Sequence, residues 1–290
     1  MLRKIFAVVC GLFLLVSCGS QKDGDPSPSG SPSMESPTLA PSSVLVVNPD
    51  GTTVAARFIP PASFTRVVYP DGSLGRWLQD LPLQPDGSPV LLFDGTVRSP
   101  SNHAAVIKLD IGSTDSQQGT DAYIRLVSEY LFAADRAQEI TFHFFSGFIC
   151  DFATWSQGNR IHVEGKKVSW VKKENPASDY DTLRSYLRTI NAYSNAKSIL
   201  TDTQEAGEWA AGCLLLNTEA GAAMIADAAV NEETGAKAVI VVQAKSPAED
   251  IHILKNPSSL DGSPWFIVDN GINTLDGRFT DGDLRSFLVT

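Results

Sequence analysis

The chain has 290 residues, 43% of them hydrophobic, and a formal net charge of −10 at pH 7. That length can bury one large core or two small ones. The negative charge would repel a phosphate backbone, so the composition argues against a nucleic-acid partner.

The amino terminus carries a pattern typical of a bacterial lipoprotein signal. Arg3 and Lys4 precede an apolar run over residues 5–16, which is too short to span a bilayer and has the length of a signal-peptide core. The run ends in LVSC, which resembles the lipobox at which bacterial lipoproteins are cut before the cysteine and acylated. We therefore expect residues 1–17 to be a signal peptide and Cys18 to carry the lipid. The alternative is a cleaved secretory peptide with an incidental cysteine.

Residues 18–43 are predicted to form a disordered tether. Positions 19–43 hold eight Ser, five Pro and three Gly, a composition that cannot bury a core. If flexible, such a segment reaches roughly 25–30 Å. The acidic pair Asp23 and Asp25 resembles signals that sort lipoproteins to the outer membrane or cell surface. These features predict a lipid-anchored protein of the cell envelope.

Three segments show the apolar spacing of amphipathic helices. The first follows Asp115, where Gln118 stands three residues later as in a capping box, and its apolar positions run on to Ala134. A second helix is predicted from about 180 to 194, and a short third one over 74–81.

The remaining apolar runs are short and resemble strands. Because consecutive strands follow a helical middle, the order favours an α+β fold with a carboxyl-terminal antiparallel sheet over a doubly wound parallel sheet. We expect one such domain over residues 44–290. The predicted strands are 54–59, 90–93, 104–111, 140–145, 160–163, 213–216, 222–229, 238–243, 251–254 and 265–268.

Motifs for nucleotide, serine-hydrolase and zinc chemistry are missing from the sequence. Its four histidines form no metal-binding spacing with each other or with cysteine. We therefore expect no cofactor and no metal. Cys150 and Cys213 could pair in an oxidising compartment, but their apolar neighbours favour two buried free thiols.

Two long segments carry a family resemblance. They read DSQQGTDAYIRLVSEYL (residues 115–131) and QAKSPAEDIHILKNP (residues 243–257). Together with shorter segments at 77–85, 91–95 and 155–160, they resemble an uncharacterised family of bacterial lipoproteins, catalogued as a domain of unknown function. The resemblance covers the chain from about Ala56 to Leu288 and implies no established activity.

The pattern of that family resembles a papain-like thiol hydrolase. Its first segment reads Q-Q-C-A-D-A and a later strand reads G-H-A-V, which implies a thiol at a helix start and a nearby imidazole base. In this chain Gly119 stands at the Cys position, and Gly221 stands at the His position (or Ala222, because the register is open by one residue). Glycine supplies neither a nucleophile nor a base.

Polar residues around these two glycines persist and form a candidate groove. They are Gln117, Gln118, His103, Asp227 and Gln243. The resemblance implies that Gln243 would orient the imidazole and that a Gln before the nucleophile would help form an oxyanion hole. Because the flanking residues remain while both reacting groups are lost, we expect a binding site rather than an active centre.

Three functions remain open from the sequence. The leading one is a non-catalytic envelope lipoprotein that binds a cell-wall peptide or glycan. The second is an active cell-wall or peptide hydrolase that uses other residues, such as Cys150 or Asp151 with His162 or His103. The third is a structural subunit of a surface complex.

Overall fold

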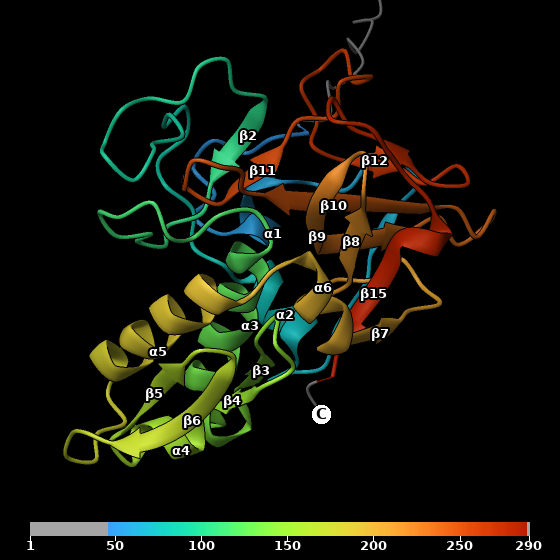
Figure 1. Cartoon of the computed structure of the whole chain (residues 1–290). Coiled ribbons are helices and arrows are strands. Elements are labelled where there is room, and N and C mark those ends of the chain that lie inside the picture. The colour runs from blue at the N-terminus through green and yellow to red at the C-terminus, as the bar shows by residue number, and fades with distance from the viewer. Residues whose placement is uncertain (1–45, 289–290) are drawn as a thin grey trace, which may run out of the picture. The chain divides into compact units, whose positions relative to one another are not determined.

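A nine-stranded antiparallel sheet dominates the computed structural model, which describes residues 46–288 (Figure 1). The predicted signal peptide, Cys18 and the whole predicted tether lie outside the described residues. The strands follow the order β2-β11-β10-β9-β8-β15-β7, with β1 paired to β9 and β12 paired to β10. Their bounds are β1 Thr65–Arg66, β2 His103–Val106, β7 Thr203–Glu205, β8 Leu214–Asn217, β9 Gly221–Val230, β10 Lys237–Gln243, β11 His252–Leu254, β12 Phe266–Ile267 and β15 Leu284–Phe287.

The helices and three small hairpins complete the described fold. The hairpins are β3 (Thr141–His143) with β4 (Ile149–Asp151), β5 (Asn159–Glu164) with β6 (Lys167–Lys172), and β13 (Ile272–Asn273) with β14 (Arg278–Phe279). The helices are α1 Val54–Arg57, α2 Leu74–Gln79, α3 Asp121–Ala133, α4 Phe152–Ser156, α5 Tyr180–Tyr193 and α6 Ala196–Thr201, with short 3₁₀ turns at Ala137–Glu139 and Asp281–Asp283.

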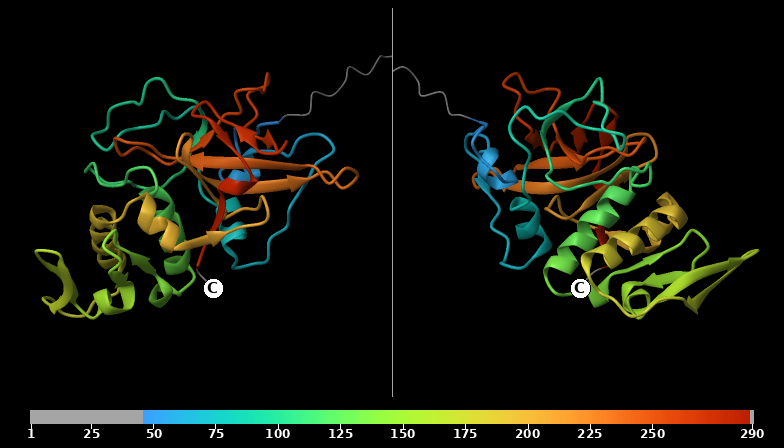
Figure 2. Two further views of the ribbon diagram at one scale, coloured as in Figure 1. Left: turned by 45° about the vertical axis from the view of Figure 1, so that its right-hand side comes forward. Right: turned by 90° about the vertical axis from the view of Figure 1, so that its left-hand side faces the viewer.

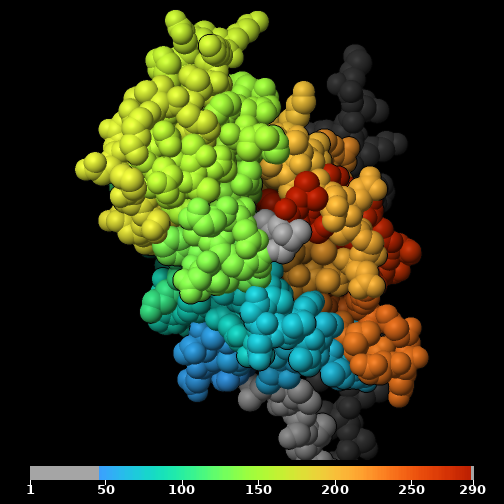
Figure 3. Space-filling model, turned by 90° about the horizontal axis from the view of Figure 1, so that it is seen from below, coloured from blue at the N-terminus to red at the C-terminus, as the bar shows by residue number. Residues whose placement is uncertain are grey.

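The two central strands, β9 and β10, are covered on both faces. On β10, Ala238, Ile240 and Val242 belong to the core shared with the helices, while Val239 and Val241 pack into a second core on the opposite face. This alternation follows from the period of two in a strand. Figure 2 shows α3 and α5 together on one side of the sheet. In Figure 3 the helical middle, green to yellow, stands beside the orange and red strands.

The predicted α+β class, with a helical middle before an antiparallel sheet, is confirmed. The predicted helices at 74–81 and 180–194 correspond to α2 and α5. The Asp179 side chain caps α5 by accepting a hydrogen bond from the Thr182 backbone N–H at 2.8 Å. Cys150 and Cys213 are both free and buried, as expected.

Several local predictions are wrong. The predicted strand over 90–93 makes only isolated bridges at Leu91 and Leu92, and the one over 104–111 ends at Val106. The predicted strand over 54–59 contains the short helix α1, because the Thr53 side chain caps it by accepting from the Ala56 backbone N–H. Helix α3 begins at Asp121, and the expected capping box at Asp115 and Gln118 lies in the preceding loop, where the Gln118 side chain donates to the Asp115 carboxylate at 2.7 Å.

Candidate functional site

Gly119 and Gly221 line one hollow of about 320 Å³, which we call the glycine hollow. Gly119 lies just before α3 and Gly221 opens β9, so the fold brings together two positions far apart in the chain. Both glycines have positive φ, +54° and +80°, and a Cβ built on either would meet no atom within 4 Å. The lining residues of this hollow are Gly119, Glu219, Ala220, Gly221, Ala222, Gln243, Ala244, Lys245 and Asp276.

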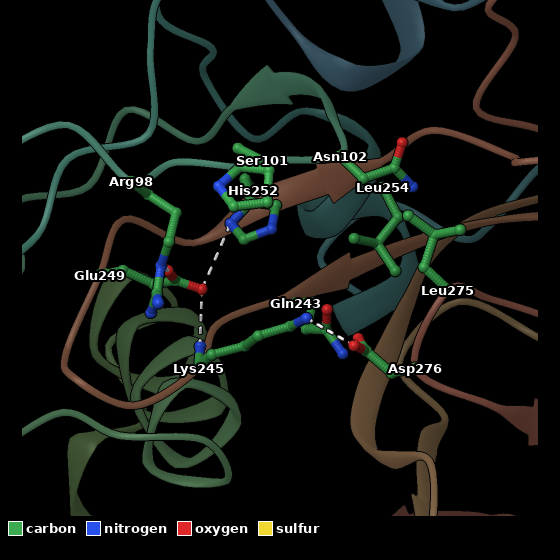
Figure 4. Close-up of a pocket in the computed structure, with 11 residues that line it drawn as sticks. Arg98, Ser101, Asn102, Gln243, Lys245, Glu249, His252, Leu254, Leu275 and Asp276 are labelled. Atoms are coloured by element: carbon green, nitrogen blue, oxygen red, sulfur yellow. Dashed lines mark hydrogen bonds and ion pairs between the residues drawn. The ribbon is translucent and has the colours of Figure 1, made fainter.

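A second cavity of about 410 Å³ adjoins the glycine hollow, and we call it the histidine cavity. Gln243, Lys245 and Asp276 line both spaces, so the two lie side by side, and we call them together the groove. Figure 4 shows the labelled side chains around this cavity. The cavity is lined by Arg98, Pro100, Ser101, Asn102, Gln243, Lys245, Glu249, His252, Leu254, Leu275 and Asp276.

Gln243 is the predicted site residue at the centre of the groove. It ends β10 and is 3% exposed. Its side-chain Nε2 lies 3.4 Å from the Ala222 carbonyl oxygen, to which it donates, while Oε1 accepts no hydrogen bond from the described residues. A buried amide oxygen without a donor costs about 1–3 kcal/mol. A donor on a bound molecule would therefore be stabilising here.

Two ion pairs lie in the wall of the groove. The Arg98 guanidinium contacts the Glu249 carboxylate, which is buried and also accepts from the Lys245 backbone N–H at 2.8 Å. Burial raises the pKa of Glu249, and Arg98 opposes this shift. The Lys245 ammonium lies 2.7 Å from the Asp276 carboxylate. The charges that line the histidine cavity are therefore matched in pairs.

His252 presents an acceptor nitrogen. Its Nδ1 lies 2.9 Å from the Asp250 carbonyl oxygen, which can only accept, so Nδ1 carries the proton and Nε2 holds the lone pair. Burial lowers the pKa of His252 to about 4, so the ring is neutral at physiological pH. His103, another predicted site residue, packs edge-on against this ring at 6.2 Å between centroids.

Three other predicted residues make structural contacts. Gln117 is buried beside Arg125, from which its Oε1 accepts at 3.4 Å, and it does not line either part of the groove. Gln118 accepts from the Ser246 hydroxyl at 2.9 Å and so ties the loop before α3 to the loop after β10. Asp227 is buried in an ion pair with Arg66 and lines neither space.

The sequence reasoning missed Lys245, Glu249, His252 and Asp276 as groove residues. The first three lie in the segment 243–257, whose length and order carried the family resemblance. That segment supplies the end of β10, the following loop and β11, and its residues line the groove because β10 and β11 pair as a hairpin. Asp276 comes from the turn between β13 and β14.

The residues named for a different hydrolytic centre do not line the groove. Cys150 is fully buried, and burial raises the pKa of its thiol far above the ordinary value. Asp151 caps α4 by accepting from the Thr154 backbone N–H at 2.6 Å, and His162 sits exposed on the β5–β6 hairpin. Among residues 46–288, no group of three or more His, Cys, Asp or Glu is arranged to hold a metal ion.

Asp121, in the first turn of α3, is a buried carboxylate that stabilises the loop carrying Gly119. It accepts from the Gln118 backbone N–H at 3.1 Å and from the Ser194 hydroxyl at 3.0 Å. Burial raises the pKa of Asp121 to about 6, although both hydrogen bonds oppose the shift. The folded state therefore holds a proton on this residue more tightly than the unfolded chain.

This shift predicts a pH-dependent effect of Asp121→Asn. The contribution of protonated Asp121 is complete below its unfolded pKa of about 3.9 and is lost as pH rises through about 6. Asparagine keeps the polar contacts without the charge. The unfolding free energy of the variant relative to wild type should therefore be about 2 kcal/mol higher at pH 7 than near pH 4. Urea titrations of both proteins measure it, and an unchanged difference would contradict the shift.

The fold and groove define an α+β domain with a polar cleft at the end of its sheet. The chain belongs to the family described as "Domain of unknown function (4846)", which matches residues 54–286. The resemblance to an uncharacterised domain family is thus confirmed. No curated protein and no solved structure matches the chain. No helix within the described residues is long and apolar enough to cross a membrane.

Proposed function

We propose that the protein is a lipid-anchored envelope lipoprotein that binds a cell-wall peptide or glycan in this groove without cleaving it. The observation that carries the proposal is the placement of Gly119 and Gly221 in one hollow. These are the positions at which the family resemblance implies a thiol and an imidazole. A thiol-hydrolase scaffold that has lost both groups would leave an open site with its substrate-binding walls in place.

The chemistry of the glycine hollow suits binding. Its lining, as far as residues 46–288 describe it, contains no thiol, hydroxyl or imidazole. It does contain an amide, two carboxylates and an ammonium, which are groups that bind polar chains. Anchoring through Cys18, where acyl chains contribute about 0.8 kcal/mol per buried methylene, would keep this groove close to the envelope polymers.

Filling the hollow should weaken binding. Gly119→Phe places a ring where a Cβ meets no atom, so it is expected to occupy the space that the ligand needs and to raise the dissociation constant for a soluble muropeptide at least fivefold, about 1 kcal/mol. Gly165→Phe is the matched control. Gly165 lies in the β5–β6 turn at φ +60°, also with open space, so both variants place phenylalanine at a similar left-handed φ. Isothermal titration calorimetry on both variants measures the difference.

Other outcomes would support the other functions. Equal binding by both glycine variants would remove the glycine hollow as the binding site. Release of product from the muropeptide would support the hydrolase alternative. Recovery of a stoichiometric protein partner from the native envelope, with no muropeptide binding, would support a structural subunit.

A further inference from the structure

The charged side chains that line the histidine cavity are paired with each other. The Arg98 guanidinium contacts Glu249, and the Lys245 ammonium contacts Asp276. The Asn102 amide N–H donates to a backbone carbonyl at 3.0 Å. A charged ligand would find no unmatched opposite charge at this wall. The cavity therefore disfavours ions.

Two polar atoms of its lining are available as acceptors. Gln243 Oε1 accepts no hydrogen bond from the described residues, and the amide is almost fully buried at the shared wall. His252 Nε2 holds a lone pair because Nδ1–H donates to the Asp250 carbonyl, and the low pKa of the buried ring keeps that lone pair available. A matching ligand must bring hydrogen-bond donors without charge.

Two leucines line the opposite side of the cavity. Leu254 and Leu275 stand on one side of the space, across from Glu249 and Lys245 (Figure 4). The volume of about 410 Å³ lies within the usual range of small-molecule sites, about 300–1,000 Å³. A sugar ring combines several hydroxyl donors with apolar C–H faces, whereas an uncharged peptide side chain offers at most one amide group.

We infer that the histidine cavity binds a neutral sugar unit, with Gln243 and His252 accepting hydrogen bonds from its hydroxyl groups and Leu254 and Leu275 contacting its C–H face. The inference rests on the proposed function and deepens it, because it assigns the glycan part of the ligand to one end of the groove. The glycine hollow then receives the rest of the ligand.

The test is binding of the neutral disaccharide di-N-acetylchitobiose to the full chain, held in a detergent without a sugar headgroup and followed by saturation-transfer NMR. Leu275→Trp fills the cavity from a side chain that is 67% exposed, so it should fold normally. It is expected to weaken binding at least tenfold. The matched control, Leu260→Trp, changes a fully exposed leucine outside the cavity and should bind like wild type. Gln243→Leu, which removes the acceptor at similar size, is expected to weaken binding about fivefold.

The outcomes separate this inference from the proposed function. If the disaccharide does not bind wild type, or binds Leu275→Trp as well as wild type, the sugar assignment is overturned. Muropeptide binding that is lost in Gly119→Phe would still support the proposed function in that case. If Leu275→Trp loses the disaccharide while Gly119→Phe leaves muropeptide binding unchanged, the sugar site stands and the role of the glycine hollow falls.

Discussion

Asp227→Ala is expected to lower the free energy of unfolding by about 3 kcal/mol while leaving the groove able to bind. The Asp227 carboxylate is fully buried; it accepts from the Arg66 guanidinium at 2.8 Å and from the Gln79 amide at 2.7 Å. Truncation would leave a partly buried guanidinium and a buried amide donor without this partner, which is the costly way to break such a pair. Because a quarter of the Arg66 side chain is exposed, water offsets part of the cost.

Urea unfolding of Asp227→Ala beside Asp80→Ala measures this effect. Asp80 also pairs with an arginine, Arg76, at 2.7 Å, but both side chains are about half exposed, so its loss should cost no more than about 1 kcal/mol. Equal costs for the two variants would show that burial adds nothing at Asp227. A loss of muropeptide affinity in the folded Asp227→Ala protein would contradict the structural role and restore Asp227 to the groove.

Local pattern was sufficient to predict the long elements α3, α5, β9 and β10. Leu183, Tyr186, Leu187 and Ile190 repeat at helical spacing and are buried on one face of α5. The predicted strands at 222–229 and 238–243 correspond to β9 and β10, because long apolar runs are expected to be buried in a sheet. Helix α1 was missed because its four residues are decided by one hydrogen bond from the Thr53 side chain rather than by a periodic pattern.

The site could be predicted only in part, because the sequence does not give the direction in which each side chain points. Gln117 and Gln118 are neighbours, yet one turns toward Arg125 and the other toward Ser246, and no spacing rule distinguishes them. Asp227 lies at an irregularity where β9 has one residue more than β10, so Ile240 pairs with Asp227 but Val241 pairs with Ile225. A bulge of this kind changes the direction of the neighbouring side chains, and the sequence pattern does not predict it.

Gly119 and Gly221 do line one hollow, as a shared site at these two positions would require. The backbone conformation also distinguishes Gly221 from Ala222 as the position of the imidazole. Gly221 holds a φ of +80°, which favours glycine, whereas Ala222 pairs regularly with Leu216 in the sheet. Both residues line the hollow, so an imidazole would be accommodated with less strain at Ala222.

The pair of substitutions Gly119→Cys and Ala222→His is therefore expected to restore an activated thiol. An imidazolium within hydrogen-bond reach lowers the pKa of a cysteine from about 8.5 to about 6.5, which raises its thiolate fraction near pH 6 about 75-fold. The lower basicity of that thiolate reduces its nucleophilicity about eightfold, so the net gain in alkylation rate is about tenfold. Cys150 and Cys213 are buried and should contribute little to the measured rate.

Iodoacetamide kinetics near pH 6 compare the double variant with Gly119→Cys alone, so that both proteins carry the new thiol at the same left-handed position. Gly165→Cys with Ala222→His is the control, because Gly165 has a similar φ in the β5–β6 turn and does not line the hollow that Ala222 lines. A gain confined to the first pair would mean that residues 119 and 222 face each other as a nucleophile and a base must. If the histidine changes neither rate, the two positions share a hollow without sharing a reaction geometry, and descent of this groove from a thiol hydrolase would have to be abandoned.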